Sequence, residues 1–346
     1  MSAVAGQRWL RSAPFDLLLV VGVLALALAL GGAALTSPAA FTIVVYADVW
    51  LLAYPHIASM YTRVAFDRVS VKAHRFLLFG LPPLVLLATA GATWAGGVVA
   101  LNTIYFYWQS WHYTRQSYGI ARAYARTGGQ PRAAPDLVSD CVVYAFPLWG
   151  LLHRAQQQHA EFFGAPLWSP RVPHGVVMAV AVFALASLAV WTWQRLRPGR
   201  DEAPPRVGHA LFVLSHVVMT LVSYVAVRDI TRGWLFINIW HNAQYMLFVW
   251  AFNARQFRGG VDPARRLVSR LSQRGNVLGY ALTCLGLSTL FYATLGQLTS
   301  RTAITVLPVV LVTHQAVNFH HYIVDAVIWR SRRASGPPGG KAVSTG

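Results

Sequence analysis

Residues 312–325 read Val312-Thr-His-Gln-Ala-Val-Asn-Phe-His-His-Tyr-Ile-Val-Asp325 and guide the interpretation of the whole chain. They lie within an apolar run, residues 304–329, that is long enough to cross a bilayer. On a helix, four polar side chains of this run share one face because they are four, three and four residues apart. These are His314, Asn318, His321 and Asp325. A polar stripe in a membrane span is costly unless it faces protein, water or a metal, so the stripe predicts a functional site.

The composition is that of a membrane protein. Of 346 residues, 55% are hydrophobic and only 12% are charged, and the mean hydropathy is +0.45. Soluble domains carry about 25% charged residues. Several windows of about 20 residues lack charge almost entirely, which is typical of transmembrane helices. We therefore expect an all-α integral membrane protein, a polytopic bundle of about ten transmembrane helices.

The expected spans are residues 15–35, 41–62, 76–94, 98–113, 137–152, 176–193, 209–227, 234–252, 277–298 and 304–329. Gly96 and Gly97 predict a turn between the third and fourth spans, and the fourth helix is expected to continue to Arg126. Asp136 is a candidate N-cap for the fifth helix. We expect one transmembrane domain over residues 1–330, including an amphipathic surface helix at about 263–274, and a disordered cytoplasmic tail over residues 331–346.

The basic residues predict the orientation. With ten spans, all but five of the 29 Lys and Arg residues fall on one side of the membrane. The five exceptions are Arg154, Arg171, Arg228, Arg232 and Arg301. The positive-inside rule makes the basic side cytoplasmic and places both termini there, as in a multi-pass protein of the plasma (inner) membrane. The net charge of +18 then reflects loops facing the cytoplasm and anionic lipid, and no nucleic-acid partner is expected.

Histidine is the compositional feature that points to chemistry. The chain has 12 His, against 11 acidic residues in all, and its two cysteines, Cys141 and Cys284, offer neither a disulfide framework nor a CxxC motif. A metal would therefore be held by nitrogen and oxygen ligands. Topology places histidines of five spans in or near the cytoplasmic half of the membrane. The candidate metal ligands are His56, His112, His216, His241, His314, His320, His321 and Asp325.

Each of these histidines also has a simpler interpretation, because a buried imidazole can merely hydrogen-bond to a neighbouring helix. The pair His320-His321 has a further limit, since adjacent helical residues point about 100° apart. Either one is a ligand while the other packs, or the two address different metals. His321 is the stronger candidate because it shares the polar stripe, and Asp325, one turn away, is expected to be a ligand or to accept the other ring N–H of a ligand.

With His314, His320 and His321, the last span resembles the membrane-bound histidine-box proteins, the desaturase- and hydroxylase-like non-haem di-iron enzymes. The resemblance implies iron and a lipid substrate. This chain has no HxxxH and no strict HxxHH motif, and Gln315 and Asn318 stand where a further box histidine would be sought. Each of five helices would supply one or two metal ligands. That is closer in style to a carotene-cleaving membrane oxygenase or a cytochrome b-like bundle.

These observations favour a metal-dependent membrane oxidoreductase of the oxygenase, hydroxylase or desaturase type. It would use non-haem iron, as one ion or two, on a lipid or other hydrophobic small molecule, with membrane lipids and a cytoplasmic electron-donor protein as partners. A bis-histidine haem b protein that transfers electrons is an alternative. A metal or proton transporter is another, although the outer halves of several spans are nearly free of charge. In the simplest alternative, the polar residues only join helices.

Overall fold

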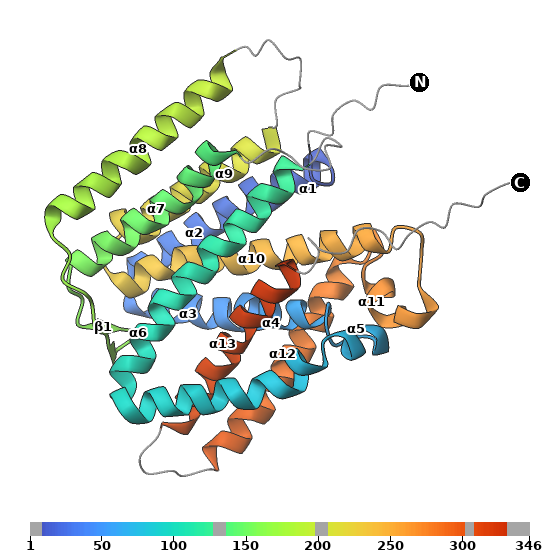
Figure 1. Ribbon diagram of the computed structural model, residues 1–346. Coiled ribbons are helices and arrows are strands. Elements are labelled where there is room, and N and C mark those ends of the chain that lie inside the picture. Colours follow the sequence, from blue (N-terminus) through green and yellow to red (C-terminus); the bar gives the residue numbers. More distant parts are fainter. Residues whose placement is uncertain (1–8, 127–135, 198–206, 302–307, 331–346) are drawn as a thin grey trace, which may run out of the picture.

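The computed structural model describes residues 9–126, 136–197, 207–301 and 308–330, and these residues are almost entirely helical (Figure 1). The all-α prediction is therefore confirmed, whereas the tail predicted over residues 331–346 lies outside the described residues.

The first half of the chain contains the elements up to α6. They are α1 (Ala13–Leu17), η1 (Leu18–Gly22), α2 (Val23–Thr36), α3 (Pro38–Asp48), η2 (Val49–Ala53), α4 (Tyr54–Tyr61), α5 (Arg68–Ala73), η3 (Phe76–Gly80) and α6 (Leu81–Ala125). The segments η1, η2 and η3 are π-helical turns that continue into the neighbouring α-helices.

The second half begins with α7 (Leu137–Gln156), the short antiparallel hairpin β1 (Glu161–Phe162) and β2 (Ala165–Pro166), and α8 (His174–Leu196). It continues with α9 (Val207–Leu221), the π-helical η4 (Val222–Ala226), α10 (Ile230–Gln256), the 3-10 turn η5 (Pro263–Arg265), α11 (Arg266–Leu271), α12 (Val277–Ser300) and α13 (Val309–Arg330). The predicted surface helix thus ends at Leu271, where the Ser272 hydroxyl bonds back to the carbonyl of Val268.

The helix boundaries follow from local chemistry. α6 changes direction at Gly97, whose φ of +67° lies in the region that glycine adopts without a side-chain clash, so the predicted Gly96-Gly97 turn is confirmed (Figure 1). The Asp136 carboxylate accepts the backbone N–H of Ser139 at the start of α7, as expected for an N-cap. Ser37 caps α3 in the same way immediately after α2 ends.

Within the described residues, six helices are long and apolar enough to cross a membrane, judged by length and composition. They are Ala13–Thr36, Pro38–Tyr61, Phe76–Ala125, His174–Leu196, Val207–Ala226 and Val277–Ser300. The remaining long helices, α7, α10 and α13, carry more polar residues. These findings indicate a membrane protein.

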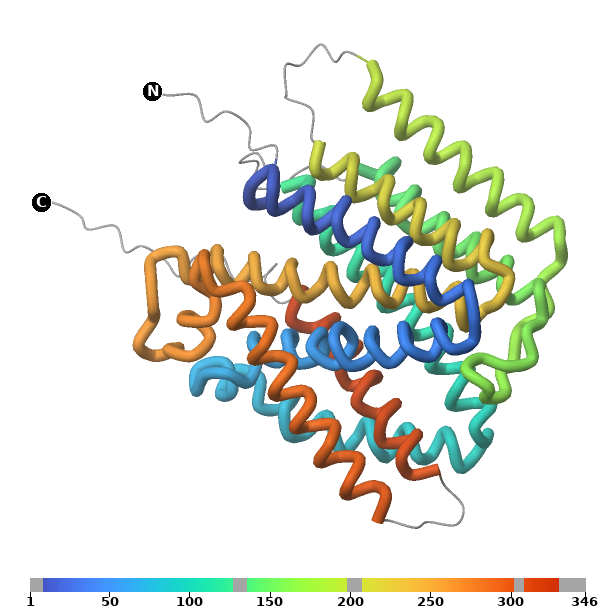
Figure 2. Tube along the Cα trace, turned by 180° about the vertical axis from the view of Figure 1, so that it is seen from behind, coloured from blue at the N-terminus to red at the C-terminus, as the bar shows by residue number. Residues whose placement is uncertain are grey.

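The centre of the molecule is α10, which is buried without a break from Gly233 to Tyr245. It packs against α2, α4 and η4, while α13 packs along α6, and α12 packs along α4. Figures 1 and 2 show α8 at the outer edge, in contact with α7. A helix covered on all sides is where polar side chains can be held away from lipid.

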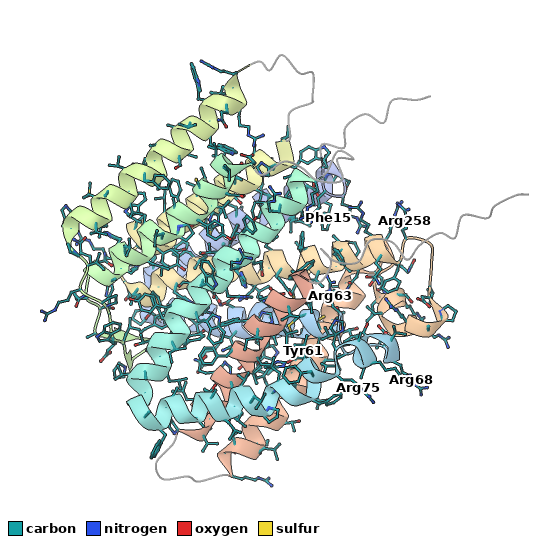
Figure 3. All side chains as sticks on the ribbon, viewed as in Figure 1. Phe15, Tyr61, Arg63, Arg68, Arg75 and Arg258 are labelled. Carbon is teal, nitrogen blue, oxygen red and sulfur yellow. The ribbon has the colours of Figure 1, made fainter. Side chains whose placement is uncertain are left out.

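The long helices run back and forth between two ends of the molecule (Figures 1 and 2). The β1–β2 hairpin and the turn at Gly97 lie at one end, and α1, α5 and α11 lie toward the other. Figure 3 shows four arginines, Arg63, Arg68, Arg75 and Arg258, at this second end. These four arginines therefore lie away from the end that contains the hairpin.

Candidate metal centre

Four buried histidines meet in the core, one from each of α4, α6, α10 and α13. They are His56, His112, His241 and His321, and none exposes more than 5% of its surface. Ring nitrogens of His56, His112 and His241 lie within 4.8 Å of one another. The Nε2 atoms of His56 and His321 are 2.8 Å apart, and the rings of His112 and His321 are 5.0 Å apart between centroids. The structure therefore brings together residues 265 positions apart in sequence.

The spacing of these nitrogens suits a metal ion. Metal–imidazole bonds are about 2.0–2.1 Å, so two nitrogens on one ion are about 3–4 Å apart. The nitrogens of His56 and His321, 2.8 Å apart, and those of His56, His112 and His241, within 4.8 Å of one another, bracket this range. Four neutral imidazoles in an apolar core form a donor set suited to iron, copper or zinc rather than to magnesium or calcium.

The hydrogen bonding of the four rings is incomplete. Within the described part of the chain, neither ring nitrogen of His241 has a hydrogen-bond partner, and Nε2 of His112 has none either. An unpaired buried polar atom costs about 1–3 kcal/mol. Because His56, His112 and His241 each place one ring nitrogen within 4.8 Å of the others, a bound cation would accept one nitrogen from each ring.

Aromatic residues hold the rings in place. Tyr245 stacks on His56 with the ring centroids 4.4 Å apart, and Tyr322 stacks on His112 at 4.5 Å. The Tyr245 hydroxyl donates a hydrogen bond to Asp325, which also accepts the indole N–H of Trp329 at 2.8 Å. The structure thus places Asp325 behind Tyr245, outside the group of four histidines.

A second buried carboxylate, Asp48 at the end of α3, was missed by the sequence analysis. It is 1% exposed and accepts hydrogen bonds from Asn238 and Asn242, which flank His241 on α10. Tyr113 donates to the side-chain oxygen of Asn238, and its ring lies 4.2 Å from that of His241. An acid inside a predicted span was the available signal, because such residues are expensive in lipid.

A small cavity of about 70 Å³ adjoins the histidines. His56, His241 and His321 line one side, and His314 and Asn318 line it further along α13. A space of this size accommodates several waters or a comparably small molecule. His314 therefore faces the same cavity without joining the four rings, and its nearest aromatic neighbours are the rings of Tyr54 and Tyr292, at 6.0 and 5.5 Å.

Two other candidate ligands lie elsewhere. His216 bonds through Nε2 to the carbonyl oxygen of Val143 at 3.0 Å, which joins α9 to α7. His320 is 2.9 Å from the Tyr61 hydroxyl through Nδ1 and 2.7 Å from the Leu77 carbonyl through Nε2. Both ring nitrogens of His320 are thereby used in packing, while His321 points to the cluster.

Comparisons with known protein families, with characterised proteins and with solved structures gave no match. The resemblance to histidine-box enzymes therefore stays a prediction, and the site geometry carries the functional argument.

Proposed function

We propose that this chain is an integral membrane metalloenzyme of the oxidoreductase class. Its metal is held by His56, His112, His241 and His321. The observation that carries the proposal is the meeting of four buried imidazoles from four helices, in which Nε2 of His112 and both nitrogens of His241 have no partner among the described residues. Helix packing alone needs one histidine at a time, as His216 and His320 illustrate, since each bonds through Nε2 to a backbone carbonyl of a neighbouring segment.

Iron as a single ion is the metal we favour. Pairs of iron ions in helical bundles use bridging carboxylates, and no carboxylate in the described residues joins the histidine group. The two nearby carboxylates, Asp48 and Asp325, are hydrogen-bonded to Asn238 and Tyr245 instead. In ionised form they would balance the charge of a divalent ion without binding it.

The same geometry speaks against a haem between two of these rings. Axial imidazoles of one iron face each other with their nitrogens about 4 Å apart across a macrocycle. Here the nitrogens of His56 and His321 are 2.8 Å apart, and the adjoining cavity is about 70 Å³. Pockets for small organic ligands measure about 300–1,000 Å³.

The membrane arrangement we propose is ten spans with both termini cytoplasmic, in the plasma (inner) membrane. Two observations support this: the long helices run back and forth between two ends of the molecule, and Arg63, Arg68, Arg75 and Arg258 lie toward one of these ends (Figure 3). The histidines then lie within the bilayer, where a lipid or another hydrophobic molecule is the natural substrate. The end with these arginines would receive an electron-donor protein.

In this proposal the bound iron supplies one-electron chemistry with O₂. The chain's own residues hold and enclose it. Tyr245 and Tyr322 fix the planes of His56 and His112, and the 70 Å³ cavity admits a small molecule while the surrounding core excludes bulk water.

Metal analysis of protein purified from iron-supplemented cells tests the proposal. We expect near-stoichiometric iron in the wild type, its loss in His241→Ala, and its retention in His216→Ala. The second variant is a matched control, because His216 is also 1% exposed but bonds to Val143. A stable wild-type protein without metal, or equal iron in both variants, would refute the proposal.

A further inference from the structure

A second, larger cavity of about 400 Å³ lies between α6, α10 and α13, beside the histidine cluster. It is a cleft open to the molecular surface, because Trp111, Gly119 and Arg126 on its rim are exposed. Its deep end contains His112, which is 5% exposed and belongs to the proposed metal site. The cleft thus joins the surface of the molecule to the candidate metal centre.

One wall of the cleft is a basic stripe along α6. His112, Arg115, Gly119, Arg122 and Arg126 all line it and follow one another at intervals of three or four residues, so they share a helix face. From His112 to Arg126 the helix rises about 21 Å. The charge increases in one direction, from a neutral buried end to arginines at the end of α6.

The opposite wall is aromatic. Phe248 and Phe252 of α10 and Trp329 of α13 line it, and Trp329 lies 5.4 and 5.3 Å from the two phenylalanine rings. The Arg63 guanidinium sits 4.2 Å from the Phe252 ring and 4.3 Å from the Trp329 ring, and Asp325 accepts the Trp329 indole N–H. These contacts fix the wall before any ligand binds, which reduces the entropy cost of binding.

The geometry points to a binding site for a single-chain amphiphile with an anionic head group. The head group would lie at Arg122 and Arg126, and the chain would lie along the aromatic wall with one of its carbons beside His112. The volume of about 400 Å³ suits one hydrocarbon chain rather than the two of a bilayer phospholipid. The binding of this amphiphile is independent of the proposed function. Its role as the substrate rests on the proposed function.

Gly119 offers a sharp test of the site. Among the described residues, a Cβ added there meets nothing within 4 Å, so a side chain at this position starts in open space at the cleft. Gly119→Leu should therefore fold normally and obstruct the chain, and Gly119→Ala is its matched control. We expect binding at least about tenfold weaker in the leucine variant and within about twofold of wild type in the alanine variant.

The probes are radiolabelled oleate, an alkyl phosphate of equal chain length and the corresponding alcohol. Binding is measured to the full chain in phosphatidylcholine nanodiscs. We expect the two anions to bind more tightly than the alcohol, and the tighter anion identifies carboxylate or phosphate as the head group. Arg126→Gln should weaken the anions but not the alcohol, while Arg258→Gln, at an exposed position outside the cleft, should change neither.

Absence of binding, unchanged binding in Gly119→Leu, or equal binding of acid and alcohol would overturn the inference. Repeating the measurement in His241→Ala separates it from the proposed function. If that protein lacks metal but still binds oleate, the cleft is a lipid site whatever the metal result. If the wild type contains iron but binds none of the probes, the amphiphile site fails and the metal centre stands.

Discussion

Two adjacent glycines of α2 provide the most direct test of how the core is packed. Gly31 faces α10, and a Cβ added to it would lie 2.5–2.6 Å from three atoms of the Phe236 ring. Gly32 is its neighbour on the same helix, and a Cβ there would meet nothing within 4 Å in the described part of the chain. Phe236 is 3% exposed and lies on α10 five residues before His241. The pair therefore tests the packing that positions the candidate metal centre.

The expected magnitudes follow from these distances. Ordinary contacts begin near 3.4 Å, so Gly31→Ala must separate α2 from the Phe236 ring by almost 1 Å. Overpacking of this kind costs about 1–3 kcal/mol. Either substitution gains up to about 1 kcal/mol of helix propensity, which cancels when the two variants are compared. We expect Gly31→Ala to be less stable than Gly32→Ala by about 1–3 kcal/mol.

The assay is reversible unfolding in mixed detergent micelles, with the metal affinity of each variant as a second measurement. Gly32→Ala should match or exceed the wild type in both. Gly31→Ala should lose stability and also bind metal more weakly, because α10 moves together with Phe236. Equal stabilities within about 0.5 kcal/mol would show that α2 does not pack on α10 as described.

Three further predictions concern single contacts. Tyr245→Phe removes a donor from Asp325 and should lower the free energy of unfolding by about 1–3 kcal/mol in the same assay. Arg154→Met should cost about 3 kcal/mol or more, because the buried guanidinium donates to three backbone carbonyls, that of Ser223 within η4 and those of Val227 and Arg228 just after it. Unfolding of this variant at the same concentration of denaturing detergent as the wild type would contradict this. Gly97→Ala forces φ of +67° on a side chain and should lower the thermal midpoint, whereas Gly91→Ala, in open space, should not.

Much of the framework could be predicted from the sequence, because its signals are local. Apolar runs of about 20 residues predicted helices, and six helices of the described residues are long and apolar enough to cross a membrane. The pair Gly96-Gly97 predicted the turn at Gly97, and Asp136 predicted the start of α7. None of these features depends on which helices are neighbours.

The site was harder to predict because sequence position gives depth in the membrane but not rotation about the helix axis. His216 lies at a depth compatible with the cluster, yet its ring points to Val143 on α7. The adjacent residues His320 and His321 contact different neighbours, as the 100° angle between adjacent helical side chains predicts. Asp48 had a visible signal, an acid in an apolar run, but its partners on α10 are 190 and 194 residues away.

The central helix gives the strongest reason to regard the histidines as functional. On α10, the polar residues Asn238, Asn242 and Tyr245 are paired with buried carboxylates, so the cost of placing them in the core is largely offset. Among the described residues, His241, at the middle of the same stretch, has no partner on either nitrogen. By contrast, His216 on α9 bonds through Nε2 to the Val143 carbonyl, and only its Nδ1 lacks a partner among the described residues. A bound metal would satisfy one of its two nitrogens, and the other would be free to donate to an acceptor or to water, as the second nitrogen of a ligand histidine ordinarily does.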